Sequence, residues 1–233
     1  MSKKIVLVAA LAAIVVIGGY VWFISRSDKM EQTPIPSVME EAPAPVPAEE
    51  APTERAEAPS AVIEMSLGNP EAEVTLIEYA SFTCIHCATF HNNSGGDLKA
   101  DFIDSGKINF VYREVYFDKY GLWAGLLARC QGPIKYFGIA DLLYERRDDW
   151  LLKSDAEIAD GLRRIGRIAG MNDETINACL ADSAKAQALV AEYQKNKEAD
   201  GVESTPSFLI NGENVSNPGY SALKELIEAE LDG

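Results

Sequence analysis

Apolar and polar positions divide the 233-residue chain into three stretches of different character. Residues 5–24 form an apolar run in which the only ionisable side chain is Tyr20. Residues 31–60 show neither the helical nor the strand period, whereas residues 61–233 contain segments of both kinds. The pattern predicts a membrane anchor in residues 1–30, a linker in residues 31–60 and one folded α/β domain in residues 61–233.

The apolar run has the length of a transmembrane helix. A helix of 20 residues rises about 30 Å, roughly the thickness of the hydrocarbon core of a bilayer. Tyr20 and Trp22 lie near its C-terminal end, and aromatic side chains of this kind favour the headgroup region. No small-residue cleavage site follows, so we expect an uncleaved single-pass anchor at residues 5–24, with a cleaved signal peptide as the alternative.

The linker has the composition of an extended tether. Residues 31–60 hold seven of the eleven prolines, and alanine and glutamate fill most of the remainder. Proline removes amide donors and like charges repel, so this stretch should be disordered, Pro/Glu/Ala-rich and unable to bury a core. At about 3.1 Å per residue it would reach at most roughly 90 Å.

Two strand patterns and a helical stretch open the folded part. Residues 74–80 are β-prone and apolar on both faces except for Glu78, which is typical of a central strand in a covered sheet. A helix is expected after the cysteine motif that follows, ending at the Asn-Ser-Gly-Gly of residues 93–96, and a second helix from Asp97 to Gly106. Residues 108–112 are then a second strand.

The remainder of the domain is helical until about residue 200, and then returns to strands. Residues of about 118–200 form a predicted helical insertion, which includes a capping box from Ser154 to Glu157. Asn-Gly at 211–212, between two short β-prone runs, predicts a hairpin. The apolar positions expected to face inward are Ile158, Leu162, Ile165 and Ile168 in the insertion, and Leu223, Leu226, Ile227 and Leu231 in a final helix.

Charge and cysteine content narrow the possible functions. The chain has 36 acidic and 21 basic side chains and a formal charge of −15, which disfavours binding to nucleic acid through bulk charge. Four cysteines are too few for a disulfide scaffold, which needs a higher cysteine fraction in a shorter chain. They suffice for one redox site and one structural disulfide.

Cys84 and Cys87, with His86 between them, form the motif that carries chemistry. Half a zinc site would need a second pair of similar spacing, but Cys130 and Cys179 stand 49 residues apart, so no metal is expected. A thiol at the start of a helix is favoured as the thiolate, which indicates a redox pair rather than two inert thiols. His86 is expected either to add a cationic or hydrogen-bonding contribution to that thiolate or to be an exposed spacer.

The motif with its surroundings resembles the DsbA family of thiol–disulfide oxidoreductases. The resemblance rests on Phe82-Thr83-Cys84-Ile85-His86-Cys87, the preceding Glu78-Tyr79 strand, the helical insertion and Ser204-Thr205-Pro206-Ser207-Phe208, and it covers residues 66–233. It implies a thioredoxin-like fold with an inserted helical subdomain. Family members commonly have proline where this chain has Ile85, and this departure affects the expected redox potential because the spacer tunes it.

The resemblance also implies roles for individual residues. Cys84 would be the exposed sulfur of low pKa that forms a mixed disulfide with substrate, and Cys87 its buried partner. Thr205 and Pro206 would form a cis-proline loop whose backbone binds an extended substrate peptide. Glu78 would be a buried carboxylate that relays a proton to or from Cys87, or alternatively the partner of a nearby lysine.

Cys130 and Cys179 are expected to form a structural disulfide, the alternative being two buried reduced thiols. In the chain-entropy model a loop of about 50 residues closed in this way stabilises the fold by roughly 4 kcal/mol. Some relatives of this kind carry a second disulfide in this subdomain.

The expected function is introduction of disulfide bonds into translocated envelope proteins. The expected partners are reduced protein substrates and a quinone-linked membrane reoxidant, with no cofactor and no nucleic acid. Disulfide donation needs an oxidising compartment, so the anchor at residues 5–24 would lie in a bacterial inner membrane with the domain in the periplasm. The alternatives are a reductase or isomerase of the same fold, or a non-catalytic peptide-binding or chaperone module.

Overall fold

A computed structural model describes residues 62–152 and 154–233 of the chain. The predicted membrane span at residues 5–24 and the predicted linker at residues 31–60 lie outside the described residues. Within the two described ranges, every helix is too short or too polar to cross a bilayer.

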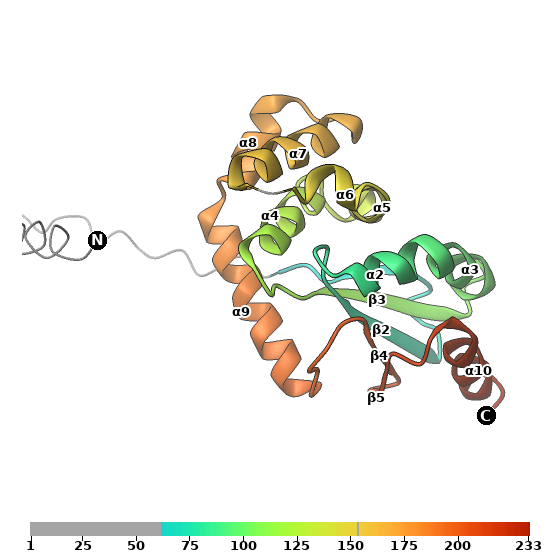
Figure 1. Cartoon of the computed structure of the whole chain (residues 1–233). Helices are drawn as coiled ribbons and strands as arrows, with labels where there is room; N and C mark the ends of the chain where they lie inside the picture. The colour runs from blue at the N-terminus through green and yellow to red at the C-terminus, as the bar shows by residue number, and fades with distance from the viewer. Residues whose placement is uncertain (1–61, 153) are drawn as a thin grey trace, which may run out of the picture. The chain divides into compact units, whose positions relative to one another are not determined.

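A five-stranded mixed sheet in the order β1-β3-β2-β4-β5 forms the centre of the domain (Figure 1). Its strands are β1 (Met65–Gly68), β2 (Val74–Ala80), β3 (Ile108–Glu114), β4 (Ser207–Ile210) and β5 (Glu213–Ser216). β2 is parallel to β3 and antiparallel to β4, and it lies in the middle of the sheet. This confirms the predicted central strand, since a strand with covered faces can be apolar on both sides.

The two faces of β2 contact different cores. Val74, Leu76 and Ala80 on one face belong to the larger cluster, together with side chains of the helices that follow the cysteine motif. Tyr79 on the other face packs with Val202 and Leu209 in a smaller cluster. Glu78 is on the side of the larger core and is completely buried there.

The helix after the cysteine motif differs from the prediction. Its backbone runs without a break through α2 (Ile85–Phe90), the π-helical η1 (His91–Gly95), α3 (Gly96–Leu98) and the π-helical η2 (Lys99–Ile103). The predicted stop at 93–96 is wrong, because Gly95 and Gly96 keep right-handed helical angles. Glycine permits a helix to end but does not require it, and the burial of Leu98 and Phe102 holds the next turns against the sheet.

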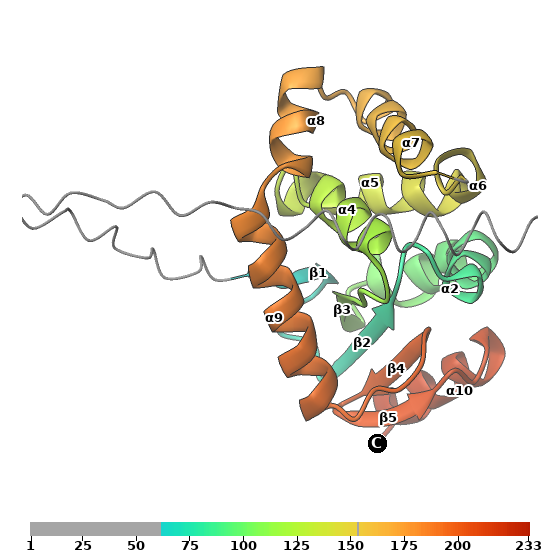
Figure 2. The same cartoon turned by 60° about the vertical axis from the view of Figure 1, so that its left-hand side comes forward.

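The helical insertion consists of six helices between β3 and β4. They are α4 (Lys119–Ala128), α5 (Pro133–Glu145), α6 (Arg147–Trp150), α7 (Asp155–Ile168), α8 (Asp173–Leu180) and α9 (Ser183–Ala199). Helices α4 to α8 gather on one side of the domain, and the long α9 runs from them along the sheet (Figures 1 and 2). The predicted capping box of Ser154 and Glu157 begins α7. Ile168, predicted to face inward, is 51% exposed because it stands in the last turn of α7.

The C-terminal part is a hairpin followed by α10 (Tyr220–Leu231). Asn211 and Gly212 both have positive φ, as a two-residue hairpin turn requires, so the predicted hairpin is confirmed. In α10, Leu223 and Ile227 are fully buried, whereas Leu226 is 39% exposed. The inward face of the helix is therefore narrower than the sequence pattern suggested.

Candidate active site

The sharp turn between β2 and α2 presents the first cysteine of the motif. Cys84 has extended backbone angles (φ −76°, ψ 123°) and is the N-cap of α2. Its sulfur accepts a hydrogen bond from the backbone N–H of Cys87 at 3.4 Å. A sulfur in this position accepts a hydrogen bond from one of the N–H groups that have no partner within the helix, and that hydrogen bond favours the thiolate.

The two thiols of the motif have opposite tendencies to ionise. Hydrogen bonding from the Cys87 thiol is the largest effect on the pKa of Cys84. Together with hydrogen bonds from the Thr205 side chain and from the backbone N–H groups of Cys87 and His86, it outweighs burial and lowers this pKa to about 5. The pKa of Cys87 is raised, first by the same hydrogen bond and then by burial. At neutral pH the pair is therefore one thiolate at the surface and one thiol in the core.

The loop before β4 lies against the cysteines, although it is more than 100 residues away in sequence. The Thr205–Pro206 peptide bond is cis. Sγ of Cys84 is 3.6 Å from the backbone carbonyl oxygen of Thr205, to which it donates a hydrogen bond when it is protonated. A polypeptide bound to Cys84 would therefore lie beside the Thr205 backbone.

Two side chains of the helical insertion hold the turn that carries Cys84. The Thr83 hydroxyl donates to the carboxylate of Asp118, the N-cap of α4, at 2.9 Å. The Arg147 guanidinium of α6 donates to the Thr83 carbonyl oxygen from Nη2 at 2.8 Å and from Nε at 3.3 Å. The insertion thus fixes the residue before Cys84 through both its side chain and its backbone.

A buried polar cluster lies one helical turn below Cys87. Oε1 of Glu78 is 3.0 Å from Nε2 of His91, which is four residues after Cys87 and so on the same helix face. The imidazole stacks on Tyr144 with ring centroids 4.2 Å apart, and the Tyr144 hydroxyl is 2.5 Å from that of Tyr112. Burial alone lowers the pKa of His91, but the charge and hydrogen bond of Glu78, with a smaller effect of Asp141, leave the pKa raised.

The structure settles where several predicted residues lie. Cys84, Cys87 and Thr205 are together at one site, and Glu78 is buried on the same side of the sheet. Among the described residues, Glu78 pairs with His91 and not with a lysine. The His86 side chain is exposed, and it is the backbone N–H of this residue that lowers the pKa of Cys84.

Sequence reasoning missed Asp118 and Arg147 in this region, and it expected His91 to cap or pack rather than to take part in the chemistry. His91 carried a usable signal, since it stands four residues after Cys87 on the same helix. Asp118 and Arg147 carried none that points to the motif, because they reach Thr83 only through the packing of the insertion.

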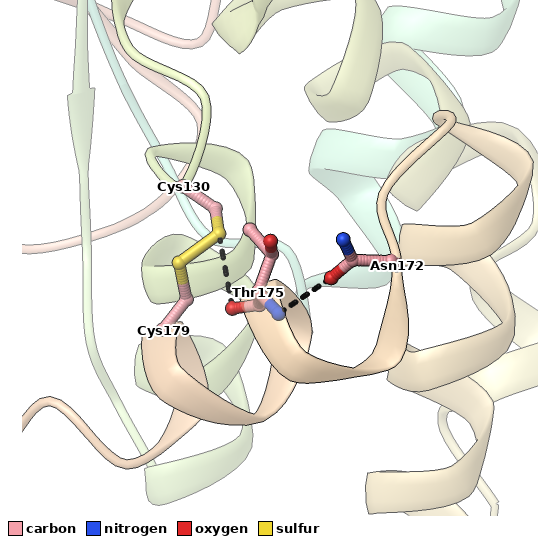
Figure 3. Close-up of a disulfide and its surroundings, with 4 residues drawn as sticks. All are labelled: Cys130, Asn172, Thr175 and Cys179. Carbon is pink, nitrogen blue, oxygen red and sulfur yellow. Dashed lines mark hydrogen bonds between the residues drawn. A yellow bond between two sulfur atoms is a disulfide. The ribbon is translucent and has the colours of Figure 1, made fainter.

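Cys130 and Cys179 form a disulfide within the insertion, with Cα atoms 5.7 Å apart. Figure 3 shows it joining the segment after α4 to α8, next to Thr175, whose N–H donates to the N-cap Asn172 at 2.8 Å. This second cysteine pair closes a loop of the insertion and is no part of the site around Cys84.

Known proteins of similar sequence have names that refer to protein disulfides. A family model described as thioredoxin matches residues 60–229. A putative protein-disulfide oxidoreductase of Rickettsia bellii is 32% identical over 170 residues, which are 72% of this chain and 65% of that protein. The chain thus spans just under two thirds of that relative. Disulfide bond formation protein D of Bacillus subtilis is 24% identical over 183 residues, covering 75% of this chain and 80% of that protein.

Solved structures with the same fold support the comparison. The crystal structure of Wolbachia pipientis alpha-DsbA1 has a TM-score of 0.66 and 25% identity, and the match covers 74% of this chain and 94% of that one. The oxidised BdbD of Bacillus subtilis has a TM-score of 0.62 at 23% identity, covering 73% of this chain and 94% of that one.

Proposed function

The chain belongs to the thioredoxin family as a DsbA-like member, and on this premise we propose that it is a thiol–disulfide oxidase acting on reduced proteins. The observation that carries the proposal is the unequal pair of thiols, with a pKa of about 5 at Cys84 and a raised pKa at Cys87. A thiol of low pKa is a good leaving group, so a disulfide that contains it is readily transferred.

The reaction has two exchange steps. A substrate thiolate attacks Sγ of Cys84, the bond from Cys84 to Cys87 breaks, and Cys87 leaves as a thiolate that takes up a proton because of its raised pKa. A second substrate thiolate then attacks the substrate sulfur of the mixed disulfide and releases Cys84 as a thiolate. The substrate loses two electrons and the cysteine pair gains them.

Other residues of the site have supporting roles in this proposal. The Thr205 backbone, beside Pro206, pairs with the extended substrate chain, as its 3.6 Å contact with the Cys84 sulfur would allow. Glu78 passes a proton to and from Cys87. His86 contributes through its backbone N–H. The disulfide of Cys130 with Cys179 is structural and stays intact through the cycle.

The cellular setting is part of the proposal. The substrates are translocated proteins with free thiols, and the reduced pair is reoxidised by a quinone-linked membrane partner. The chain is held in a bacterial inner membrane by residues 5–24, with residues 61–233 in the periplasm, because disulfides persist in oxidising compartments. The linker at residues 31–60 gives the domain reach to its partners.

The reduction potential of the full chain, equilibrated in glutathione buffers and measured by thiol alkylation, tests the direction of electron flow. A tenfold change in the equilibrium constant corresponds to about 30 mV, so the two classes separate well. A potential near or above roughly −180 mV is expected for an oxidase, and one near roughly −250 mV or lower would favour a reductase. Full biological rescue by a double serine variant of Cys84 and Cys87 would favour a non-catalytic peptide-binding module instead.

A further inference from the structure

The proposed reaction leaves open how a buried sulfur gains and loses its proton. Cys87 is completely buried, and its raised pKa means that the sulfur must be protonated whenever the disulfide opens near neutral pH. Glu78, the proposed relay, is also completely buried, and its Oε2 has no hydrogen-bond partner among the described residues. A carboxyl group with no exposed surface cannot exchange protons directly with water.

His91 is the side chain that joins Glu78 to solvent. Its Nε2 is 3.0 Å from Glu78 Oε1, and 17% of its side chain is exposed. Both residues line a cleft of about 480 Å³ between the α2–η2 helix and α5. Gly95 and Gly96 form part of the cleft wall and have no side chains that could cover the ring. The second imidazole nitrogen, Nδ1, would be only 3.8 Å from a Cβ at Gly95, so it faces this wall.

The inner end of the cluster lies within electrostatic range of the thiol. His91 is one helical turn after Cys87, on the same face. The hydroxyl groups of Tyr112 and Tyr144 form a hydrogen-bonded pair. Burial is the largest cause of the raised pKa of each tyrosine, and the charges of both Glu78 and Cys87 add to it. Both ionisable groups therefore lie within electrostatic range of the same hydroxyl pair.

We propose that His91 carries protons between water in this cleft and the Glu78 carboxyl group, and that Cys87 gains and loses its proton by this route. The inference rests on the proposed function, since it concerns the same cysteine pair. When Cys87 leaves as a thiolate, the imidazolium of His91 passes its proton to the Glu78 carboxylate, Glu78 passes that proton on to Cys87, and water recharges the imidazole. One proton moves inward and no electron is transferred; disulfide formation runs the sequence in reverse.

Several titratable or charged groups surround His91, and among them Glu78 and Asp141 shift its pKa. They come from each element packed against it and from the rim of the cleft: Glu78 on β2, Tyr112 on β3, Asp141 and Tyr144 on α5, Glu145 at the end of α5, and Lys99 on η2. The carboxylates of Glu78 and Asp141 favour the imidazolium, the form that can donate.

The test is the pH dependence of the reaction of the oxidised full chain with reduced glutathione, followed by stopped flow between pH 5 and 8. Each rate constant is divided by the thiolate fraction of glutathione, so that what remains reports proton supply to Cys87. In the unmodified protein the corrected rate should fall as pH rises through the pKa of His91. General acid catalysis contributes about 10²–10⁴-fold to a rate. The corrected rate of His91→Phe should therefore be about 10²-fold lower than that of the unmodified protein at the low-pH end, and it should not change with pH.

The variants separate proton transfer from packing. Phenylalanine keeps a ring to stack on Tyr144, and His91→Gln keeps a donor for Glu78 but cannot ionise, so it serves if the first variant fails to fold. Glu78→Gln should give the same flat profile. Glu145→Gln, which changes a charge on the same cleft without a contact to His91 among the described residues, should leave the profile unchanged.

The outcomes for this inference and for the proposed function are distinct. If His91→Phe or the folded His91→Gln keeps the corrected profile of the unmodified protein, the His91 route is refuted while the oxidase proposal stands. If the chain exchanges with glutathione but does not oxidise reduced proteins, the proposed function fails and the glutathione profile still decides the role of His91. If no exchange with glutathione occurs, both are refuted.

Discussion

Removing the Cys87 thiol should raise the pKa of Cys84, because hydrogen bonding from Cys87 is the largest single effect that lowers it. A hydrogen bond to a charged group is worth about 1.5–3 kcal/mol. At 1.36 kcal/mol per pKa unit, its loss corresponds to a rise of about 1–2 units. Cys87→Ala should therefore move the pKa from about 5 to between about 6 and 7.

The thiolate absorbance near 240 nm gives a direct assay. At pH 6 the ionised fraction of Cys84 should fall from about 90% to roughly 10–50% in Cys87→Ala. Cys87→Ser is the matched control, because its hydroxyl group can still donate to the Cys84 sulfur and should preserve most of the shift. Identical titrations of Cys87→Ala and the unmodified chain, or an equal rise in Cys87→Ser, would refute the reasoning.

The lowered pKa of Cys84 also fixes the sign of a stability effect. The pKa of Cys84 is about 5 in the folded reduced protein and near 9 when unperturbed. Ionisation of Cys84 therefore stabilises the folded reduced protein. This stabilisation is fully present above about pH 9 and is lost as pH falls through about 5.

Three further predictions concern the fold. Alanine at both Cys130 and Cys179 should lower the free energy of unfolding by about 4 kcal/mol, and reductant should then shift the urea midpoint less than in the parent chain, because only the Cys84–Cys87 pair is left to reduce. Arg129→Met leaves the buried carboxylate of Glu114 without the guanidinium that donates to it at 2.6 Å, and should cost about 3–5 kcal/mol in a urea titration; a loss below 1 kcal/mol would contradict the burial argument. Gly161→Ala should lower the melting temperature, with a cost of about 1–3 kcal/mol, because its Cβ would lie 2.6 Å from a backbone atom of α6; an unchanged melting temperature would show that the two helices can separate freely.

The order of elements and the redox pair could be predicted from local pattern. Alternating and helical periods fix which side chains can share a face, and a C-x-x-C motif between a strand and a helix places one thiol at a helix start. The Asn211-Gly212 hairpin was equally local, because its turn needs two residues that tolerate positive φ. The stop expected at Gly95 and Gly96 was wrong, because packing of later turns decides whether a permissive residue ends a helix.

The surroundings of the cysteines depended on contacts between distant parts of the chain. Arg147 donates to the carbonyl of Thr83 across 64 residues of sequence, and Thr205 reaches the sulfur of Cys84 across 121. The sequence indicated that Glu78 was an unusual carboxylate in a buried strand, and offered a relay or a lysine partner for it. Only the tertiary structure paired it with His91, because that choice depends on which helix face rests on β2 and not on any local pattern.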